Sequence, residues 1–486
     1  MERILTIDAL QNIGKECRFC GWVKNRRDHG KIIFIDLRDR WGVIQVVFTP
    51  QIPQVYELAQ QLRGEWVVEV IGLVKGRPQG MENEKSETGK IEVEAKELKI
   101  YASANTLPFS IETSGYEISE EKRLKYRYLD LRRKRLQRNL AIRQKFLHLA
   151  REFLISKGFI EIETPLLTKS TPEGARDFIV PSRLEPGKFY ALPQSPQQFK
   201  QLLMVAGIER YFQIARCLRD EDARGDRQAE HTQLDLEMSF VDQEEILKMI
   251  EELYIKAVKT LFPQKRIRQI PFPRLKYSEA MEKYHSDKPD LRENKADSSE
   301  LAFCFITDFP MFEWSPERQK WGAMHHPFTK PQTEDIQEIK KYPEKILAFQ
   351  HDFVLNGFEI GGGSIRTTNL EVLTAVFEVL GHSPKETREK FRNYFDSFSF
   401  GVPPHGGIAC GVDRFLSLLL DEPNIREVIA FPKTGDNRDL MMGAPAEVEK
   451  EQLEELHLKI AVASGIKSKK KKAKVKKRGR NKKNKK

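Results

Sequence analysis

The densest group of reactive side chains lies in a loop between two apolar segments. Residues 210–240 read RYFQIARCLRDEDARGDRQAEHTQLDLEMSF, and the apolar segments on both sides of the loop have the composition of strands. A charged loop is usually only solvated, but its arginines could also hold phosphate groups. We call residues 219–230 the charged loop; its acids and arginines are Asp220, Glu221, Asp222, Asp226, Glu230, Arg219, Arg224 and Arg227.

A second group that could bind phosphate lies near the C-terminus. In GGIACGVDRFLSLLL a glycine-rich turn places Arg414 at the start of an expected helix. An arginine of the charged loop and Arg414 could hold the phosphates of a nucleotide from both ends, and the glycines before Arg414 would let the phosphates come close to the backbone. The two groups together therefore favour a nucleotide site over a solvated loop.

The stretch FEIGGGSIR, between these groups, supplies an acid and a further arginine. Glu359 and Arg366 are seven residues apart, an odd spacing that puts them on opposite faces of a regular strand. We therefore expect a distorted strand if both reach one site. Asp352 offers a second carboxylate, and paired acids near a triphosphate suggest Mg²⁺. No cluster of cysteines and histidines in the sequence has the spacing of a zinc site.

The elements that must position these residues form a large C-terminal region, predicted at 126–465. An amphipathic helix from about residue 140 to 158 precedes the short strand GFIEIETP. Beyond it, strands occur in runs without regular alternation with helices, which favours an antiparallel sheet flanked by helices in an α+β domain.

Residues 1–103 predict a small β-barrel of the OB-fold kind. Short Val- and Ile-rich stretches punctuated by glycines indicate its strands. Along 33–38, alternation places Ile33, Ile35 and Leu37 on one face and Phe34, Asp36 and Arg38 on the other. An aromatic ring among charges on an outer barrel face could stack an unpaired base. The polar stretch 104–125 then predicts a hinge.

Composition indicates a soluble cytoplasmic protein with an unusual tail. Of the 486 residues 40% are apolar, no apolar run could span a membrane, and no secretory signal is visible. The five scattered cysteines fit free thiols in a reducing compartment. Residues 466–486 carry 14 of the 82 Lys and Arg residues and no acid, which predicts a disordered tail that either contacts phosphate backbones or only aids solubility.

Several ordered motifs resemble class II aminoacyl-tRNA synthetases. Residues of about 140–165, 210–240 and 407–420 resemble motifs 1, 2 and 3 of that class. TPEGARDF, ALPQSPQQFKQLL, HHPFTKP and GFEIGGGSIR narrow the resemblance to bacterial-type aspartyl-tRNA synthetases, over residues 1 to about 445. The resemblance implies a homodimer that consumes ATP with Mg²⁺, forms aspartyl-adenylate, and transfers L-aspartate to the 3′ end of tRNA-Asp.

The resemblance also assigns site residues, and simple electrostatics agrees: cations face carboxylates and phosphates, and acids face the ammonium group. The implied catalytic residues are Arg219, Arg414 and Glu359, with Asp352 and Glu359 holding Mg²⁺. L-aspartate would be bound by Glu173, Gln197, Lys200, Arg219, Asp235, His325, Ser364 and Arg366. ATP would be bound by Arg219, Glu221, Gln228, His231, Glu359, Gly411, Val412, Asp413 and Arg414.

In the barrel, the resemblance gives Phe34 the role of stacking on an anticodon base, beside Arg27 and Gln45. His29 and Gly80 occupy positions where discriminating members carry larger or different residues. Both resemble the relaxed form of the family, which also charges tRNA-Asn. A strictly tRNA-Asp-specific enzyme and a catalytically silent RNA-binding protein remain the alternatives.

The sequence departs from the family pattern at two places besides its tail. Bacterial members usually insert a whole domain between motifs 2 and 3, yet only some sixty residues separate Phe240 from ITDFPMFEW, so this domain looks deleted. The aromatic residue that stacks on adenine is replaced by His231, which predicts weaker ATP binding.

Overall fold

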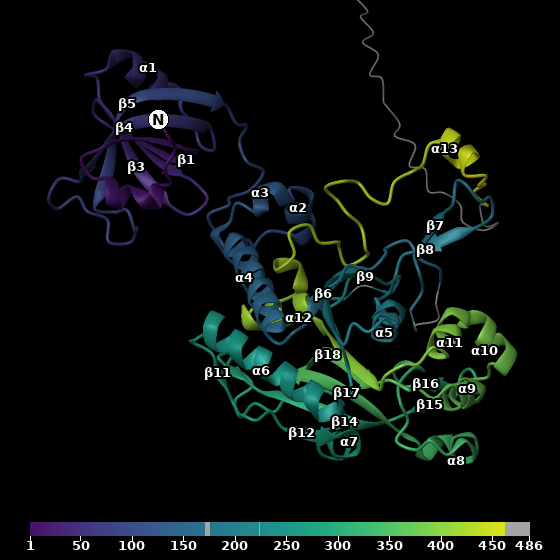
Figure 1. Cartoon of the computed structure of the whole chain (residues 1–486). Helices are drawn as coiled ribbons and strands as arrows, with labels where there is room; N and C mark the ends of the chain where they lie inside the picture. The colour runs from purple at the N-terminus through teal and green to yellow at the C-terminus, as the bar shows by residue number, and fades with distance from the viewer. Residues whose placement is uncertain (171–174, 223, 462–486) are drawn as a thin grey trace, which may run out of the picture. The chain divides into compact units, whose positions relative to one another are not determined.

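The computed structural model describes residues 1–170, 175–222 and 224–461 (Figure 1). They form two compact units, Met1–Ser110 and a second that starts at Ile111. The second half of the predicted hinge belongs to the second unit, because Arg123 of α2 (Glu120–Lys125) makes buried ion pairs with Asp130 and Glu427 there. The tail predicted at 466–486 lies outside the described residues.

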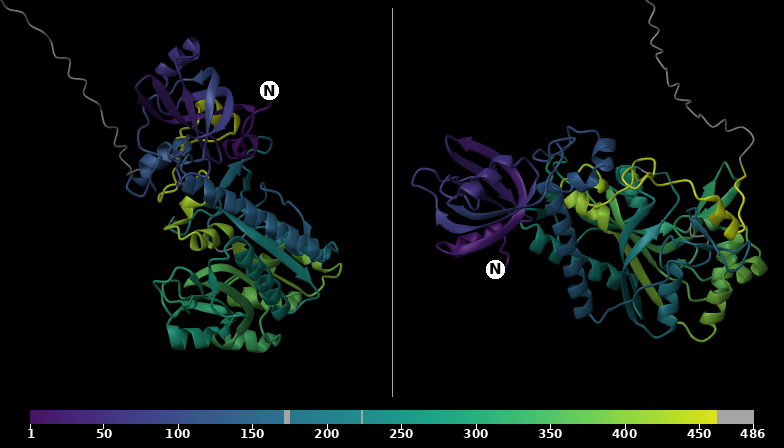
Figure 2. Two further views of the ribbon diagram at one scale, coloured as in Figure 1. Left: turned by 90° about the vertical axis from the view of Figure 1, so that its left-hand side faces the viewer. Right: turned by 90° about the horizontal axis from the view of Figure 1, so that it is seen from above.

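The first unit is a closed five-stranded barrel, which confirms the predicted OB-fold (Figure 2). Ile33, Ile35 and Leu37 are buried inside it, as their alternation predicted. Arg38 is the exception to the pattern, since it is also buried and donates to Glu65 at 2.8 Å. The elements are η1 (Thr6–Asn12), β1 (Glu16–His29), β2 (Ile32–Arg38), β3 (Val43–Phe48), α1 (Pro53–Gln61), β4 (Val67–Gly76) and β5 (Ile91–Ala102).

An eight-stranded sheet organises the second unit (Figure 1). Its six central strands are antiparallel, as predicted, whereas the two short outer strands β12 and β6 run parallel to their neighbours. In spatial order the strands are β12 (Arg274–Lys276), β14 (Phe303–Pro310), β17 (Leu347–Leu355), β18 (Phe358–Ile365), β19 (His405–Gly411), β10 (Glu230–Ser239), β9 (Arg210–Leu218) and β6 (Ile160–Glu161).

The two faces of this sheet have different chemistry. In β10 the apolar residues Leu234, Leu236 and Met238 face the main hydrophobic core, while Asp235 and Glu237 alternate with them and face the other way. Three helices cover the apolar face: α4 (Lys134–Ser156), α6 (Gln243–Leu261) and α12 (Val412–Leu419). The polar face is therefore free to build a site.

The remaining elements surround the sheet. The helices are α3 (Arg127–Asp130), α5 (Gln197–Val205), α7 (Tyr277–Tyr284), α8 (Ile336–Lys341), η2 (Pro343–Lys345), α9 (Leu370–Val379), α10 (Pro384–Lys390), α11 (Arg392–Phe398), η3 (Ile425–Glu427) and α13 (Lys450–Glu455). Three short strand pairs complete the unit: β7 (Ile179–Pro181) with β8 (Phe189–Ala191), β11 (Arg266–Ile267) with β13 (Glu300–Leu301), and β15 (Phe312–Ser315) with β16 (Lys320–Ala323).

The predicted loss of an inserted domain agrees with the chain path after α7. Only residues 285–299 lie between the end of α7 and β13, and they contain no helix or strand. The five cysteines are free thiols, four of them buried. None of the helices in the described ranges is both long and apolar enough to cross a membrane.

Candidate active site

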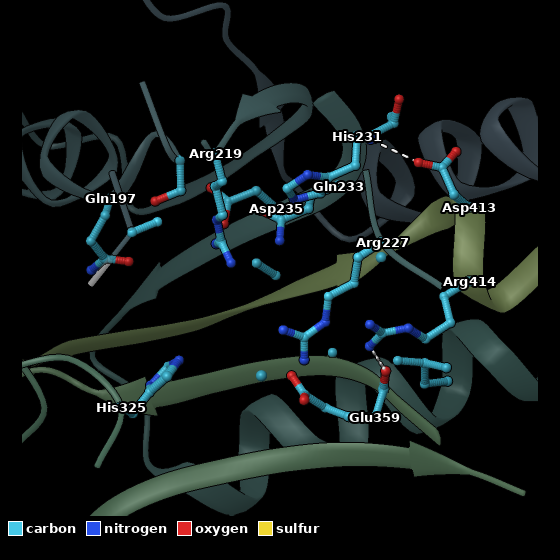
Figure 3. A pocket seen from close by; sticks show the side chains of 18 of the residues that line it. Gln197, Arg219, Arg227, His231, Gln233, Asp235, His325, Glu359, Asp413 and Arg414 are labelled. Atoms are coloured by element: carbon cyan, nitrogen blue, oxygen red, sulfur yellow. Dashed lines mark hydrogen bonds between the residues drawn. The ribbon is translucent and has the colours of Figure 1, made fainter. Parts of the chain in front are cut away.

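A cavity of about 410 Å³ opens on the polar face of the sheet (Figure 3). Its lining includes residues of the charged loop, of the segment around Arg414, and of the glycine-rich strand β18 that lies between them in the sequence. Gln197 and His325 lie at one end in Figure 3, His231 and Arg414 at the other, and Arg219 between them. The predicted residues on its wall are Gln197, Lys200, Arg219, Glu221, Gln228, His231, Asp235, His325, Glu359, Arg366, Gly411, Asp413 and Arg414.

Glu173 lies outside the described residues. Three other predicted site residues are described and are not on this wall. Val412 is buried in the apolar core at the start of α12. Ser364 is buried behind Arg366 and accepts a hydrogen bond from it at 2.5 Å. Asp352 lies on β17, beyond the glycine strand. The sequence could not separate these positions from the wall, because each is within two residues of one that lines it or pairs with one.

Glu359 and Arg366 both reach the cavity although their spacing is odd. Two successive residues of β17 pair with Gly361 and Glu359, so Ile360 is an extra residue in β18. This β-bulge shifts the alternation by one position, which brings Glu359 and Arg366 to the same face. The distorted strand that the spacing predicted is confirmed.

Asp352 and Glu359 converge at Gly362, where a side chain is absent. A Cβ atom at that position would lie 3.2 Å from Oδ1 of Asp352 and 3.7 Å from Oε1 of Glu359. Desolvation and the charge of Glu359 raise the pKa of Asp352 well above its usual value. Two such carboxylates fit a hard cation such as Mg²⁺. Among the described residues no third Asp, Glu, His or Cys joins this pair.

Two buried cations, Arg366 and Lys200, also line the cavity. Arg366 is 2% exposed and donates to both carboxylate oxygens of Glu237, at 2.9 and 3.0 Å. Lys200 donates to Asp235 at 2.7 Å and lies 3.3 Å from Glu237. Burial alone would raise the pKa of Glu237, but Arg366 and Lys200 lower it to about 2. The two cations are therefore fixed in place by acids beneath them.

Sequence reasoning missed Glu237, and Gly407 explains how it fits. A Cβ at position 407 would overlap the Glu237 carboxylate, so only glycine leaves room beside β10. The signal was available, because Glu237 follows Asp235 by two residues and must share its face of β10. The sequence analysis assigned a binding role to Asp235 and none to Glu237.

Asp235 and Gln197 each present an unsatisfied atom in the same region. Oδ2 of Asp235 and Nε2 of Gln197 are buried, and neither has a hydrogen-bond partner in the part of the chain that the structure describes. Burial raises the pKa of Asp235, and Lys200 opposes this effect. Buried polar atoms without partners are rare in folded proteins. A carboxylate oxygen of this kind is suited to an ammonium group and the amide to an acceptor.

Two neutral histidines close this end of the cavity. Desolvation, together with the charges of Arg366, Arg219 and Lys200, lowers the pKa of His325 to about 3. His326 was left unassigned by sequence reasoning, and its pKa is also lowered well below the usual value. Its Nε2 lies 2.7 Å from Nη1 of Arg366, so it accepts a hydrogen bond from that arginine. Adjacent histidines carry no sequence signal that tells which one faces a ligand.

The other end of the cavity is rich in arginine. Nη2 of Arg414 pairs with Asp226 at 3.0 Å and Nη1 donates to the carbonyl of Glu359. Nε of Arg414 is buried without a partner among the described residues. Arg227, which the sequence placed in the charged loop without a role, points into the middle of the cavity (Figure 3). This end can hold an anion with several charges.

His231 and Asp413 complete the wall at the arginine-rich end. Desolvation lowers the pKa of His231 to about 3, with Arg219, Arg216 and Arg414 adding to the effect. The ring is therefore neutral at physiological pH. Asp413 turns toward the sheet, where it accepts a hydrogen bond from the backbone N–H of Thr232 at 3.0 Å and pairs with Arg143. Gln233 and Ser195 also line the cavity and were missed, although Gln233 lies two residues from both His231 and Asp235 on β10 and so shares their face.

The barrel unit gathers its predicted residues on its outer face. Phe34 is half-buried opposite Arg27 on β1, and the ring of His29 meets it edge-on at 5.9 Å. Nη2 of Arg27 donates to Gln45 at 3.2 Å. Gly80 belongs to the loop of 77–90 and has a φ of +81°, a conformation that favours glycine. Arg27, His29, Phe34 and Gln45 thus form one patch. Gly80 lies apart from them in sequence, in the loop between β4 and β5.

Comparisons with known proteins agree with these two units. The family of class II tRNA synthetases (D, K and N) matches residues 119–435, and the OB-fold nucleic acid binding domain matches residues 17–101. Among solved structures, an asparaginyl-tRNA synthetase from Pyrococcus horikoshii with asparaginyl-adenylate shares the fold, with a TM-score of 0.71 at 23% identity over 89% of this chain and 98% of that one.

Proteins named aspartate–tRNA(Asp/Asn) ligase resemble most of the chain. Those of Rubrobacter xylanophilus and Dictyoglomus turgidum are each 43% identical over 93% of this chain, and 95% and 96% of their own length. The first alignment spans 574 positions, more than the 486 residues here, so that relative contains residues without a counterpart. The chain therefore belongs to the class II tRNA synthetases, and within them to the family of aspartate–tRNA(Asp/Asn) ligases.

Proposed function

We propose that the protein activates L-aspartate with ATP and transfers it to the 3′ end of tRNA-Asp and tRNA-Asn. The observation that carries this proposal is the pair of buried cations, Arg366 and Lys200, at one end of a cavity whose other end is lined with arginines. An acidic side chain fits the first end, and a triphosphate fits the second. The unsatisfied oxygen of Asp235 supplies a place for the ammonium group.

The reaction follows from positioning. Arg219 lies between the two ends of the cavity (Figure 3). With aspartate at the cation end and ATP at the arginine end, it would contact both the α-carboxylate and the α-phosphate. The carboxylate attacks the α-phosphorus in line, and pyrophosphate leaves toward Arg414. The arginines stabilise the charge that develops on the phosphate oxygens. A terminal tRNA hydroxyl then attacks the carbonyl carbon of the aspartyl-adenylate, the bond from this carbon to the phosphate oxygen breaks, and AMP leaves.

The direct test compares substrates side by side. ATP–pyrophosphate exchange with aspartate, asparagine and lysine distinguishes this protein from its subclass relatives, because Arg366 and Lys200 should reject a lysine side chain. Exchange with aspartate alone is expected. No exchange with any of the three would favour a silent RNA-binding protein instead.

Charging of tRNA-Asn is proposed from His29, from Gly80 and from the family to which the chain belongs. Parallel aminoacylation of purified tRNA-Asp and tRNA-Asn should give comparable rates. If aspartyl-tRNA-Asn forms far more slowly than aspartyl-tRNA-Asp, the strictly tRNA-Asp-specific alternative is correct.

Asp352 and Glu359 are proposed to hold Mg²⁺, which would shield the ATP phosphates from these carboxylates. Mg²⁺ is therefore expected to tighten binding of a non-hydrolysable ATP analogue by about tenfold or more, the value of one charge-assisted contact. In Asp352→Asn most of this gain should disappear. Calorimetric titration of the analogue with and without Mg²⁺ measures it, and an equal gain in the variant would remove Asp352 from the site.

Phe34 is expected to affect tRNA and not adenylation. Phe34→Ala should raise KM for tRNA by about 5- to 100-fold, the value of one stacked base, because a stacking surface is lost. ATP–pyrophosphate exchange needs no tRNA and should stay at the wild-type rate. Trp41→Ala, which removes an exposed aromatic near the opposite end of β2, is the matched control. A similar KM for tRNA in both variants would contradict the stacking role.

A homodimer is proposed from four exposed apolar residues around β6. Ile155, Ile160, Leu166 and Leu167 are each at least half exposed, an arrangement that is costly in a lone subunit. Sedimentation equilibrium distinguishes a dimer from a monomer. Free buried thiols agree with a cytoplasmic location, which we also propose.

A further inference from the structure

A C-terminal segment, residues 425–437, braces the charged loop; Ile425 lines the cavity, whereas Lys433 and Asn437 do not. At the tip of the loop, the backbone N–H of Ile425 donates to the carbonyl of Gly225 at 3.2 Å. Further along, the backbone N–H of Lys433 donates to Oε1 of Gln228 at 3.1 Å. Asn437 makes the last of these contacts, near the base of the loop. None of the three bracing residues was singled out by the sequence.

Asn437 joins the two limbs of the charged loop with one amide group. Its Oδ1 accepts from the backbone N–H of Ala229 at 3.1 Å, and its Nδ2 donates to the carbonyl of Glu221 at 3.0 Å. Glu221 lies on the outgoing limb and Ala229 on the returning limb. A planar amide holds its two atoms at a fixed separation, so these contacts fix the spacing of the limbs at this level.

The backbone at Asn437 is shaped to present this amide. Its φ is +59°, a left-handed conformation in which asparagine and glycine are tolerated. The surrounding turn is closed by its own hydrogen bonds, from Asn437 N to the Thr434 carbonyl at 3.0 Å and from Thr434 N to the Arg438 carbonyl at 2.9 Å. Glycine at 437 would therefore keep the turn and delete only the amide.

Arg219 does not depend on this brace to the same extent. Its backbone N–H donates directly to the carbonyl of Ala229 at 2.7 Å, which closes the base of the loop without Asn437. The residues at the cation end of the cavity come from other elements, since Lys200 lies on α5 and Asp235 on β10. Loss of the amide should thus loosen Glu221 and Gln228 while leaving the aspartate end intact.

We propose that Asn437 is a positioning residue that holds the charged loop in the spacing required for ATP. The inference rests on the proposed function, in which Glu221 and Gln228 face the nucleotide. It identifies the segment after motif 3 as a structural part of the ATP site, although Asn437 itself does not line the cavity.

The test uses the full-length Asn437→Gly protein. Calorimetric titration with a non-hydrolysable ATP analogue should show Kd raised by about 5- to 30-fold, the loss expected for two hydrogen bonds. KM for ATP in pyrophosphate exchange should rise in parallel, while KM for aspartate stays within about twofold of wild type. Asn437→Asp keeps the hydrogen-bond acceptor but not the donor. Its Kd for the ATP analogue should lie between those of wild type and Asn437→Gly.

Asn356→Gly is the matched control. Asn356 also has a left-handed φ, of +50°, and its side chain accepts from the N–H of Ala302 at 2.8 Å and donates to the carbonyl of Glu300 at 3.0 Å. It makes the same pair of contacts away from the charged loop. Its variant should lower the melting temperature and leave Kd for the ATP analogue unchanged.

Three outcomes would overturn the proposal: an unchanged Kd for the analogue in a folded Asn437→Gly protein, an equal rise in KM for both substrates, or the same Kd change in Asn356→Gly. Because the titration needs no catalysis, it separates this inference from the proposed reaction. A wild type that binds the analogue but fails to exchange with aspartate would contradict the proposed function and leave the Kd comparison intact.

Discussion

Replacing Arg219 with alanine is expected to lower ATP–pyrophosphate exchange by about three orders of magnitude or more, the effect of removing an arginine that stabilises a phosphoryl-transfer transition state. Its Nη atoms point into the cavity and make no hydrogen bond or ion pair to any residue that the structure describes, while Nε donates to the Gln194 carbonyl at 3.4 Å. The guanidinium is therefore anchored on one side and free to bind ligand on the other.

The fold should survive this change, because Arg219 holds no buried ion pair together. The melting temperature of Arg219→Ala is thus expected to match that of wild type. Arg219→Lys keeps the charge but loses the planar fork, and it should remain at least about tenfold slower. Arg318→Ala removes an exposed arginine of the β15–β16 turn and serves as the control, with unchanged exchange. Near-normal exchange in Arg219→Ala would exclude Arg219 from the reaction.

The strands and helices around the site followed closely from sequence periodicity. The helix expected from about residue 140 to 158 is the C-terminal part of α4, and the apolar segment before the charged loop is β9. Periodicity reports which side of an element is buried, so it works for elements that are half-buried on one face. It failed at residues 158–165, where β6 covers only Ile160–Glu161, because backbone pairing and not side-chain burial defines a short edge strand.

From residue types alone, the site could be predicted only where charged side chains stand beside apolar or glycine-rich segments, as in the charged loop and at Arg366. The uncharged wall residues Gln197, Gln228 and His325 were predicted only through the family resemblance. Glu237 shares its face of β10 with Asp235, but it was missed, because the alternation in LDLEMS does not show that its partner is Arg366, more than a hundred residues away. Asn437 was missed because its partners are backbone atoms more than two hundred residues away.

Glu237→Gln is expected to lower the free energy of unfolding by about 3 to 5 kcal/mol at pH 7, the cost of breaking a buried ion pair and leaving its partner charged. In this variant Arg366 loses its carboxylate partner and Lys200 keeps only Asp235, and both cations are 2% exposed. Glu313→Gln, at an exposed position of β15, is the control and should change stability little. Urea denaturation followed by circular dichroism gives both values.

The pH dependence of this difference tests its electrostatic origin. The pKa of Glu237 is about 2 in the folded protein, below the value of about 4.3 for an unfolded glutamate. A lowered pKa contributes stability that is present above the unfolded value and is lost as the pH falls toward the folded one. The gap between wild type and Glu237→Gln should therefore stay constant from pH 8 to pH 5 and narrow below that. A gap that instead widened on acidification would mean that Glu237 is buried as a neutral acid and that Arg366 and Lys200 are balanced by other groups.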